Sequence, residues 1–240
     1  MQEALAKPYH KPSDLHGSYL RRFYRAMGGK VALLLQNTPV TPNHVTLASF
    51  FLGLLALPFV VWGVFPFHLI AAGLLFLSMI LDKADGSLAR LKGTSSALGT
   101  WLDSTTDYLG IFLFFLMVGA HFHYVQDKPI YWFFVFLGFG GYNISKLMYI
   151  YFKRYFGKDA DAVVEEEKEK HPLRSSFHVN EIFVNNIFFL FLLIGRLDWL
   201  LWFMAGYGLL FSAGIYGVLT YKAVRKNRTH SPEEGMYSKF

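Results

Sequence analysis

Cysteine does not occur in this chain of 240 residues. Its absence excludes disulfide bonds, thiolate metal sites and cysteine nucleophiles. Charged residues are scarce, because they make up 17% of the chain where a typical soluble domain has about a quarter. Hydrophobic residues make up 53%. This balance argues against a soluble protein and predicts an integral membrane protein.

The charged residues stand in short islands between apolar runs, and no stretch has the mixed polarity of a separate soluble domain. We therefore predict one membrane domain over residues 1–240. A helix that crosses a bilayer needs about 20 mainly apolar residues. The predicted fold is accordingly all-α, with six transmembrane helices in a bundle over residues 43–224 and a tail over residues 225–240. The six predicted spans cover residues 43–64, 67–91, 96–120, 129–152, 181–194 and 199–224.

Another helix is predicted ahead of the bundle, over residues 17–37. Apolar residues recur there at helical spacing, and basic residues occupy the other side. We interpret the segment as an amphipathic helix that lies in the membrane interface, with its basic face toward the lipid headgroups. A surface helix packed on the protein's own core is the alternative. The apolar positions are Leu20, Phe23, Tyr24, Met27, Val31, Leu34 and Leu35, and the basic ones are Arg21, Arg22, Arg25 and Lys30.

Lysine and arginine are unevenly distributed between the two ends of the predicted bundle. They gather in the N-terminal segment, in the loops after the second and fourth spans and in the C-terminal tail, whereas the opposite side holds only Lys128 and Arg196. Basic loops mark the cytoplasmic side of a membrane protein. Both termini are therefore predicted to be cytoplasmic. The net charge of +6 has the same explanation, so membrane lipids and not nucleic acid are the expected partners.

Four aspartates interrupt the second and third predicted spans. Asp82 and Asp85 are three residues apart, and Asp103 and Asp107 are four apart, so each pair occupies one face of its helix. A charged side chain at the centre of a bilayer costs roughly 3 kcal/mol or more. Acids in such positions are therefore candidates for a functional site.

A short turn around the residues KGTSS joins these two spans. Gly93 can end the first helix, and Ser95 or Ser96 can cap the next. We expect the two helices to pack against each other antiparallel, with the two aspartate pairs facing each other near the cytoplasmic ends.

Four carboxylates so close together would repel one another unless cations lay between them. Oxygen ligands without histidine or cysteine suit Mg²⁺, Mn²⁺ or Ca²⁺ better than zinc or copper. A pair of divalent cations can stabilise both sides of a phosphoryl displacement. We predict two divalent cations, Mg²⁺ or Mn²⁺, at the aspartates.

The residues around the acids fit a phosphate-bearing ligand. Gly86, Ala89 and Gly99 are small enough to let a bulky group reach the cations, and Arg90 is placed to meet a phosphate. Lys83 is not expected to pair with Asp82, because neighbours on a helix point apart. It is expected to snorkel toward the interface or to face a cavity. Helix–helix hydrogen bonding or a proton path would explain a lone aspartate better than four.

The complete pattern resembles a known family. The residues Asp82-x2-Asp85-Gly86-x2-Ala89-Arg90-x8-Gly99-x3-Asp103-x3-Asp107 match the signature of the CDP-alcohol phosphotransferase family at each position. The segment TPNHVT, from Thr41 to Thr46, is also similar to the family's entry into the first span.

The resemblance implies an enzyme of phospholipid biosynthesis. Such enzymes transfer a substituted phosphoryl group from a CDP-linked lipid donor, such as CDP-diacylglycerol, to a small alcohol acceptor and release CMP. It implies metal ligation by Asp82, Asp85, Asp103 and Asp107, with Asp107 also acting as the base on the acceptor hydroxyl. The implied CDP site comprises Gly86, Ala89, Arg90, Gly99, Asn43 and Thr46. The resemblance further implies a homodimer, with an active site open to the cytoplasmic side.

The acceptor is less clearly indicated. The segments DGSLARLKGTSSALG and TPNHVT are most similar to the inositol-phosphate-like branch of the family, which favours inositol phosphate or another small polyol. An acceptor that carries a phosphate needs further cations, and Lys146, Arg154 and Arg174 are the candidates. The alternative for Lys146 is a lysine that snorkels to the interface.

Three other functions remain open at this stage. One is a CDP-choline or CDP-ethanolamine type of phosphotransferase with diacylglycerol as acceptor, to which the segment TSSALG bears some similarity. Another is a membrane transporter or channel, which would need polar residues along several helices, although the last two predicted spans are nearly apolar. The third is a catalytically inactive scaffold, in which the loss of an aspartate would be expected.

Overall fold

The computed structural model describes residues 19–170 and 181–230, and these residues contain helices and no strand. The all-α prediction is therefore confirmed for this part of the chain. The elements are α2 (Tyr19–Leu35), α3 (Pro42–Trp62), α4 (Phe65–Lys92), α5 (Ala97–Ala120), η2 (His121–Val125), α6 (Tyr131–Lys170), α8 (Glu181–Ile194), α9 (Leu197–Gly206), η3 (Tyr207–Phe211) and α10 (Ser212–His230). Both η2 and η3 are single π-helical turns that continue the preceding α-helix.

Among the described residues, four helices are long and apolar enough to cross a membrane: Pro42–Trp62, Phe65–Lys92, Ala97–Val125 and Tyr131–Gly157. They coincide with the first four predicted spans and support the assignment to membrane proteins. The fifth predicted span coincides with α8, a shorter apolar helix. The sixth lies within the helical run from α9 through η3 to α10.

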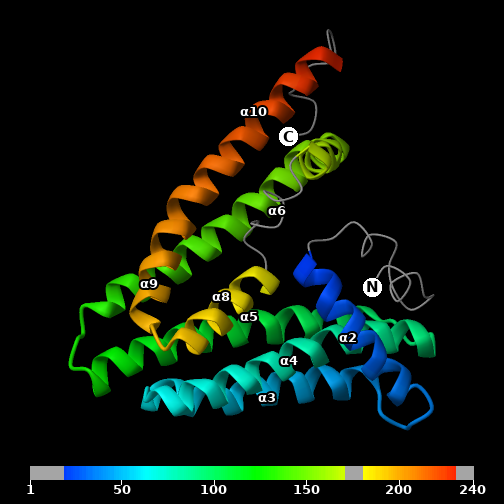
Figure 1. The fold of residues 1–240 in the computed structure, drawn as a ribbon. Helices are drawn as coiled ribbons and strands as arrows, with labels where there is room; N and C mark the ends of the chain where they lie inside the picture. The colour runs from blue at the N-terminus through cyan, green and yellow to red at the C-terminus, as the bar shows by residue number, and fades with distance from the viewer. Residues whose placement is uncertain (1–18, 171–180, 231–240) are drawn as a thin grey trace.

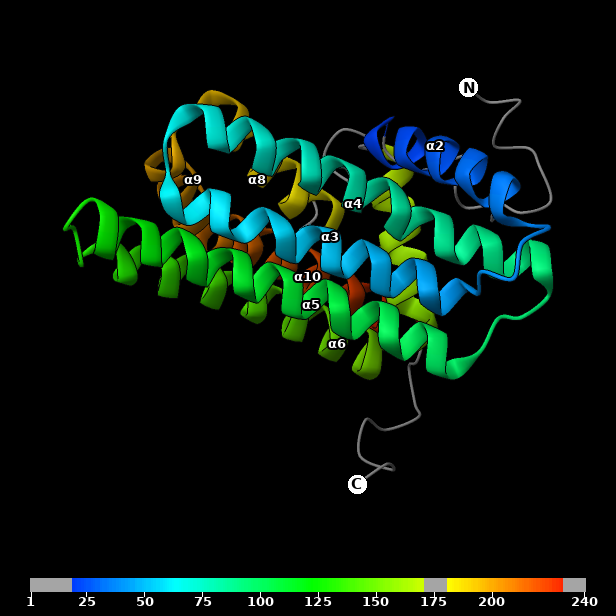
Figure 2. The same cartoon turned by 90° about the horizontal axis from the view of Figure 1, so that it is seen from below.

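The arrangement of α3, α4 and α5 differs from the expected one. The helices α4 and α5 run in opposite directions, but α3 lies between them and is the main neighbour of both (Figure 2). Direct packing of α4 on α5 was therefore the wrong expectation. The physical reason is that these two helices carry the acids and diverge around a pocket, so α3 supplies the packing surface that they do not give each other.

Two serines hold α3 against α4 within the apolar layer. The Ser49 hydroxyl donates to the backbone carbonyl of Ser78 at 3.0 Å, and the Ser78 hydroxyl donates to the carbonyl of Ser49 at 2.9 Å. Small hydroxyl residues let membrane helices approach closely and also supply hydrogen bonds that lipid cannot.

The first helix, α2, lies across α4 at one end of the bundle (Figure 1). Gly28 is buried at the crossing, where a Cβ atom would lie 2.7 Å from the carbonyl carbon of Lys83. The Tyr24 hydroxyl donates to the amide oxygen of Asn186 on α8 at 3.0 Å, and burial raises the pKa of Tyr24 to about 12. The helix predicted over residues 17–37 is thus present and packs on the protein's own core along part of its length.

The helix ends that surround the aspartates are defined by capping groups. Thr41 and His44 form a reciprocal capping box at the start of α3, so the segment TPNHVT begins this helix as predicted. Gly93 ends α4 in the left-handed conformation, and the Ser96 hydroxyl accepts from the backbone N–H of Gly99 at the start of α5. These are the stop and the cap that the sequence indicates.

A lysine fixes the loop between α2 and α3 to the end of α4. The Lys92 ammonium donates to the backbone carbonyls of Thr38 at 2.6 Å and Val40 at 2.8 Å. This contact determines where α3 begins and therefore places its first turn beside the end of α4.

The apolar core lies where α4, α5, α8 and α9 meet. The rings of Phe114 and Phe188 stack at 4.1 Å between centroids, and Phe134 stacks on Trp202 at 5.4 Å. In Figure 1, α6 and α10 extend side by side away from the layer of α3, α4 and α5.

Candidate metal and nucleotide site

Three of the four aspartates converge. One carboxylate oxygen from each of Asp82, Asp85 and Asp103 lies within 4.8 Å of the other two. Asp82 and Asp85 stand one turn apart near the end of α4, and Asp103 stands in the second turn of α5. Because three carboxylates at this distance repel one another strongly, the cluster suits a hard divalent cation, which prefers oxygen ligands.

Asp85 is the most buried of the three, with 6% of its surface exposed. The Thr46 hydroxyl on α3 donates to its Oδ2 atom at 2.6 Å, and the backbone N–H of Gly86 donates to its Oδ1 atom. These two donors orient the carboxylate toward the cluster. Thr46 therefore contacts a predicted metal ligand, and it also lines the pocket described next.

A pocket of about 470 Å³ opens beside the cluster. Its walls come from α2, α3, α4, the turn after α4 and the first turns of α5. All six residues predicted for a CDP site line it, together with three of the aspartates. The lining residues are Arg25, Pro42, Asn43, Thr46, Asp82, Lys83, Asp85, Gly86, Ala89, Arg90, Thr94, Ser95, Ser96, Gly99, Thr100 and Asp103.

The two glycines of the motif leave room for polar side chains. A Cβ atom on Gly86 would lie 3.5 Å from a guanidinium nitrogen of Arg90 and 3.8 Å from one of Arg25. A Cβ atom on Gly99 would lie 3.2 Å from the amide oxygen of Asn43. Glycine at these positions thus keeps two cationic groups and an amide close to the pocket.

The expectation that Lys83 does not pair with Asp82 is wrong. The Lys83 ammonium forms an ion pair with the Asp82 carboxylate, and both side chains are only 14% exposed. Neighbouring side chains leave a helix about 100° apart, but the long lysine side chain bends back, since an unpaired charge in a buried site is costly. The expectation that Lys83 faces a cavity is correct, because it lines the pocket.

Arg25 is a site residue that the sequence interpretation missed. It was assigned to a basic face turned toward lipid headgroups, whereas it lines the aspartate pocket from α2. The pair Gly28-Gly29, one turn further along α2, was the available signal, because adjacent glycines permit close contact with another helix. The crossing of α2 over α4 brings Arg25 to the pocket.

Asp107 lies outside the cluster of three. It lines a smaller pocket of about 60 Å³ together with Asp82, between α3, α4, α5 and α8. Asp82 is shared by the two pockets, so the smaller one begins where the larger one ends. Asp107 is therefore positioned on the other side of Asp82 from the predicted CDP site.

Of the three candidate acceptor residues, the structure describes Lys146 and Arg154, which stand about two turns apart on α6. Lys146, on α6, forms an ion pair with Glu181 and lies 5.2 Å from the ring centroids of both Tyr108 and Tyr142. Tyr108 directly follows Asp107, but neither Tyr108 nor Lys146 lines the smaller pocket. Arg154 is exposed further along α6. Arg174 lies outside the described residues.

A comparison with known protein families agrees with the family that the aspartate pattern resembles. The model of the CDP-alcohol phosphatidyltransferase family matches residues 39–210, which contain the complete aspartate pattern. The chain belongs to the CDP-alcohol phosphatidyltransferase family. This family is generally dependent on divalent cations, and the oxygen-only cluster of Asp82, Asp85 and Asp103 fits such an ion. Membership in this transferase family argues against a transporter.

Two relatives of this CDP-alcohol phosphatidyltransferase are similar over shorter segments. The inner membrane protein YnjF of Escherichia coli (strain K12) is 38% identical over 76 residues, which cover 32% of this chain and 35% of that protein. Archaetidylinositol phosphate synthase of Aeropyrum pernix is 39% identical over 89 residues, which cover 37% of this chain and 44% of that protein. The chain thus spans less than half the length of either relative.

Proposed function

We propose that this protein transfers a substituted phosphoryl group from a CDP-linked lipid, such as CDP-diacylglycerol, to the hydroxyl of a small alcohol, with release of CMP. The acceptor oxygen forms a bond to the phosphorus that carries the lipid alcohol. The bond from that phosphorus to the bridging oxygen breaks, and this oxygen leaves with CMP. Asp107 takes the proton of the acceptor hydroxyl.

The observation that carries the proposal is the shared pocket. The carboxylates of Asp82, Asp85 and Asp103 and the guanidinium groups of Arg25 and Arg90 line one cavity of about 470 Å³. A diphosphate needs positive charge around it, and phosphoryl transfer depends mainly on positioning and charge neutralisation. A site that joins cation ligands to arginines at one cavity meets both needs.

The acids take different roles in this proposal. Asp82, Asp85 and Asp103 hold divalent cations, Mg²⁺ or Mn²⁺, and Asp107 contributes to a second ion beside Asp82. When bound, these ions neutralise the charge that develops on the phosphoryl oxygens. Thr46 and the backbone N–H of Gly86 keep Asp85 oriented. A general base needs to lie within hydrogen-bond reach of the hydroxyl it deprotonates, and the separate small pocket at Asp107 provides a place for that hydroxyl.

The donor is assigned to the larger pocket. Its nucleotide lies along Gly86, Ala89 and Gly99, where side chains are small, and its phosphates lie near Arg90 and Arg25. Asn43 and Thr46 border the same space from α3. Arginine guanidinium groups bind phosphates through paired hydrogen bonds, which supports a phosphate-binding role for both arginines.

The reacting hydroxyl of the acceptor is assigned to the smaller pocket of about 60 Å³. The name of the Aeropyrum pernix relative favours an inositol phosphate. The ion pair of Lys146 with Glu181 neutralises this candidate acceptor residue, and this favours an uncharged polyol. An acceptor with its own phosphate would have to displace Glu181 from Lys146. Inositol and inositol phosphate are therefore the two acceptors to compare first.

The membrane arrangement completes the proposal. We propose six spans, formed by α3 to α6, α8 and the run from α9 to α10, with both termini and the aspartate pocket on the cytoplasmic side. The distribution of Lys and Arg supports this orientation. A homodimer is proposed from family membership.

The test is CMP release by the purified full chain in detergent with CDP-diacylglycerol and Mg²⁺. The acceptor panel contains inositol phosphate, inositol, glycerol 3-phosphate and serine. We expect release that depends on one acceptor and stops when EDTA is added. A folded, metal-loaded protein that releases no CMP with any acceptor would contradict this choice of donor.

A second panel then separates the alternative reaction. CDP-choline and CDP-ethanolamine are offered with diacylglycerol as acceptor, under the same metal conditions. Release in this panel alone would assign the chain to the branch with a soluble donor. Both panels use Asp103→Asn as the control for metal-independent hydrolysis.

A further inference from the structure

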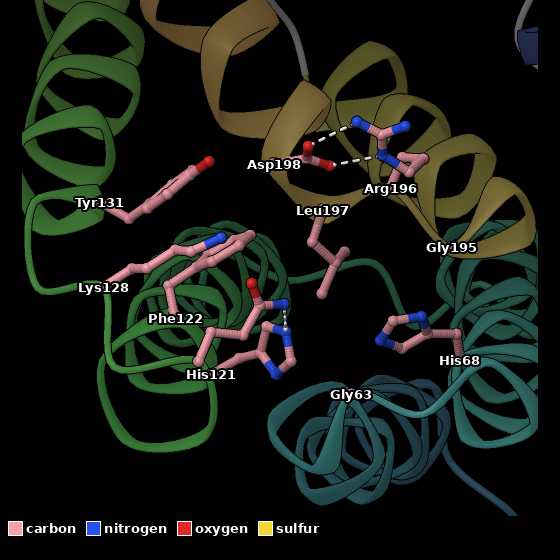
Figure 3. Close-up of a pocket in the computed structure, with 11 residues that line it drawn as sticks. Gly63, His68, His121, Phe122, Lys128, Tyr131, Gly195, Arg196, Leu197 and Asp198 are labelled. Atoms are coloured by element: carbon pink, nitrogen blue, oxygen red, sulfur yellow. Dashed lines mark hydrogen bonds and ion pairs between the residues drawn. The ribbon is translucent and has the colours of Figure 1, made fainter.

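A second polar cavity lies at the end of the bundle opposite the aspartates. The loop from α3 to α4, the turn after η2 and the loop from α8 to α9 meet there, at the left of Figure 1. The cavity has a volume of about 250 Å³ (Figure 3). His68 on its wall is 14 residues before Asp82 on α4, a separation of about 21 Å along a helix. The cavity is therefore separate from the proposed active site.

His68 is a buried polar side chain without a partner among the residues that the structure describes. Only 3% of its surface is exposed, and neither ring nitrogen has a hydrogen-bond partner there. A neutral imidazole carries one N–H donor and one acceptor. In Figure 3 the ring is directed across the cavity toward His121, whose centroid is 6.2 Å away. The His68 side chain lines the cavity, and its two buried nitrogens are hydrogen-bonding groups that a polar ligand can satisfy.

His121 is held in one tautomer beside it. Its Nδ1 atom lies 2.9 Å from the backbone carbonyl of Val61, which can only accept, so Nδ1 carries the proton. Its Nε2 atom then accepts from the Gln126 amide at 2.9 Å. Both ring nitrogens of His121 are occupied, and this leaves His68 as the histidine available to a ligand.

The cavity also collects the basic residues of this side of the protein. Lys128 and Arg196, the two that stand apart from the cytoplasmic clusters in the sequence, both line it. The Arg196 guanidinium donates to both oxygens of Asp198, at 2.9 and 2.7 Å, so this pair carries no net charge. The Lys128 ammonium has no ion-pair partner within residues 19–170 and 181–230. One positive charge therefore remains at the cavity.

Exposed aromatic side chains place this charge at the level of lipid headgroups. The N-terminus of α9 also lines the cavity, where Asp198 already supplies a carboxylate to its first turn. Trp62, Tyr124 and Trp199, which flank the cavity in sequence, are each more than half exposed. Exposed Trp and Tyr side chains gather where a membrane protein meets the headgroups.

We propose that this cavity binds the phosphodiester group of a phospholipid headgroup, in the leaflet opposite the active site. A phosphodiester carries one negative charge, which matches Lys128, and its oxygens accept from the imidazole N–H of His68. The volume is below the range of about 300–1,000 Å³ that encloses a whole drug-sized ligand, so it suits a headgroup whose acyl chains stay in the bilayer. The site is independent of the proposed transfer reaction.

The test measures binding of dihexanoylphosphatidylglycerol to the purified full chain by native mass spectrometry. EDTA is present so that no divalent cation can hold a phosphate at the aspartates. A parallel sample contains Mg²⁺ and CDP instead, so that CDP occupies the nucleotide pocket. We expect one saturable lipid that CDP does not displace. Dihexanoylglycerol, which has the same acyl chains and no phosphate, is expected not to compete.

Variants assign the lipid to the cavity. Lys128→Gln removes an exposed charge and is expected to weaken binding about tenfold or more, since a hydrogen bond to a charged group is lost. Lys30→Gln, an exposed lysine on α2, is the matched control and is expected to bind like the wild type. His68→Phe keeps the ring shape and removes both nitrogens, and it is also expected to weaken binding.

Competition by inorganic phosphate shows whether the cavity binds free phosphate or the phosphate group of an intact lipid. Displacement by inorganic phosphate at the lipid's own affinity would identify free phosphate as the ligand, and resistance to inorganic phosphate would identify an intact lipid. Equal affinity in the wild type and Lys128→Gln would overturn the proposal, as would competition by dihexanoylglycerol. CMP release is measured on the same protein preparations with Mg²⁺ and without EDTA, so failure of this site and failure of the proposed reaction are separate results.

Discussion

At Gly86, two guanidinium groups lie within van der Waals distance of the position that a Cβ atom would take. Arg90 comes from the same helix, whereas Arg25 comes from α2 and reaches the site only because α2 crosses α4. Positive charge at the proposed diphosphate site therefore has two origins. The roles of single residues can be separated by substitutions that leave the neighbouring ones in place.

Arg25→Gln is expected to raise the KM for the CDP donor about tenfold or more, with a smaller effect on kcat. The reason is that an arginine–phosphate hydrogen bond is lost while the aspartates stay in place. Steady-state CMP release measures both constants. Lys30→Gln on the same helix is the control, and an unchanged KM for Arg25→Gln would remove this residue from the donor site.

Asp103→Asn is expected to abolish turnover and to weaken Mn²⁺ binding. An amide in place of the carboxylate removes a charged ligand from a cluster whose oxygens lie within 4.8 Å. Titration of the purified protein with Mn²⁺, followed by electron paramagnetic resonance, measures the affinity. Activity near that of the wild type would refute the assignment of Asp103 as a ligand.

Asp107→Asn is expected to reduce turnover by about 100- to 10,000-fold, the usual contribution of a general base. Binding of the CDP donor should stay largely intact, because Asp107 lines the smaller pocket and not the larger one. Isothermal titration with a non-reactive CDP analogue measures this binding. The same titration is made with Asp103→Asn. If Asp107→Asn weakened binding of the CDP analogue as much as Asp103→Asn does, Asp107 would instead be a ligand of the donor site.

At the scale of elements, the crossing of α2 over α4 determines the shape of the nucleotide pocket. Gly28 is the contact point, and the backbone of Lys83 lies directly against it. The ion pair of Lys83 with Asp82 and the position of Arg25 both depend on this contact. Packing of one helix on another is therefore coupled to the charges at the site.

Gly28→Ala is expected to lower stability by about 1–3 kcal/mol, because overpacking forces the backbone apart. Activity should fall as well, since α2 carries Arg25. Gly140→Ala on α6 is the matched control: its Cβ would meet nothing within 4 Å, so the same substitution should be neutral or stabilise the protein by about 0.4–1 kcal/mol. Thermal unfolding in detergent compares the two variants, and equal unfolding temperatures would show that the contact at Gly28 is not tight.

At the scale of the whole molecule, the two polar cavities lie at opposite ends of the same bundle. The aspartate pocket is lined by residues of α2 to α5, and the cavity at His68 by the connections of α3, η2 and α8 to the helices that follow them. The end with the aspartate pocket is also the end where most Lys and Arg residues are predicted to gather, whereas Lys128 and Arg196 line the cavity at the other end. This asymmetry makes the membrane orientation testable.

The absence of cysteine allows single cysteines to report the orientation. Asn37→Cys, in the loop before α3, and Pro129→Cys, before α6, both introduce the thiol at an exposed position. In intact cells an impermeant maleimide should label Pro129→Cys and spare Asn37→Cys, with both labelled after lysis. The reverse pattern would contradict the proposed cytoplasmic site.

The features that the sequence predicted correctly depend on interactions between residues close together in the chain. Helix lengths follow from apolar run lengths, and the ends at Gly93 and Ser96 follow from the preferences of single residues for left-handed and capping conformations. The spacing of Asp82 and Asp85 placed both on one face of their helix for the same reason, because helical periodicity is a local property. By itself, the sequence determined the all-helical membrane character, the motif and the helices that carry it.

Only the tertiary structure decided which helices touch. It placed α3 between α4 and α5, brought Arg25 to the aspartates, paired Lys83 with Asp82, and left Asp107 outside the cluster of three acids, in a pocket that it shares with Asp82. It also gathered Lys128, Arg196 and His68 around one cavity. These outcomes depend on the rotation and crossing of whole helices, which are set by packing between segments far apart in the sequence and leave no periodic signal in any one of them.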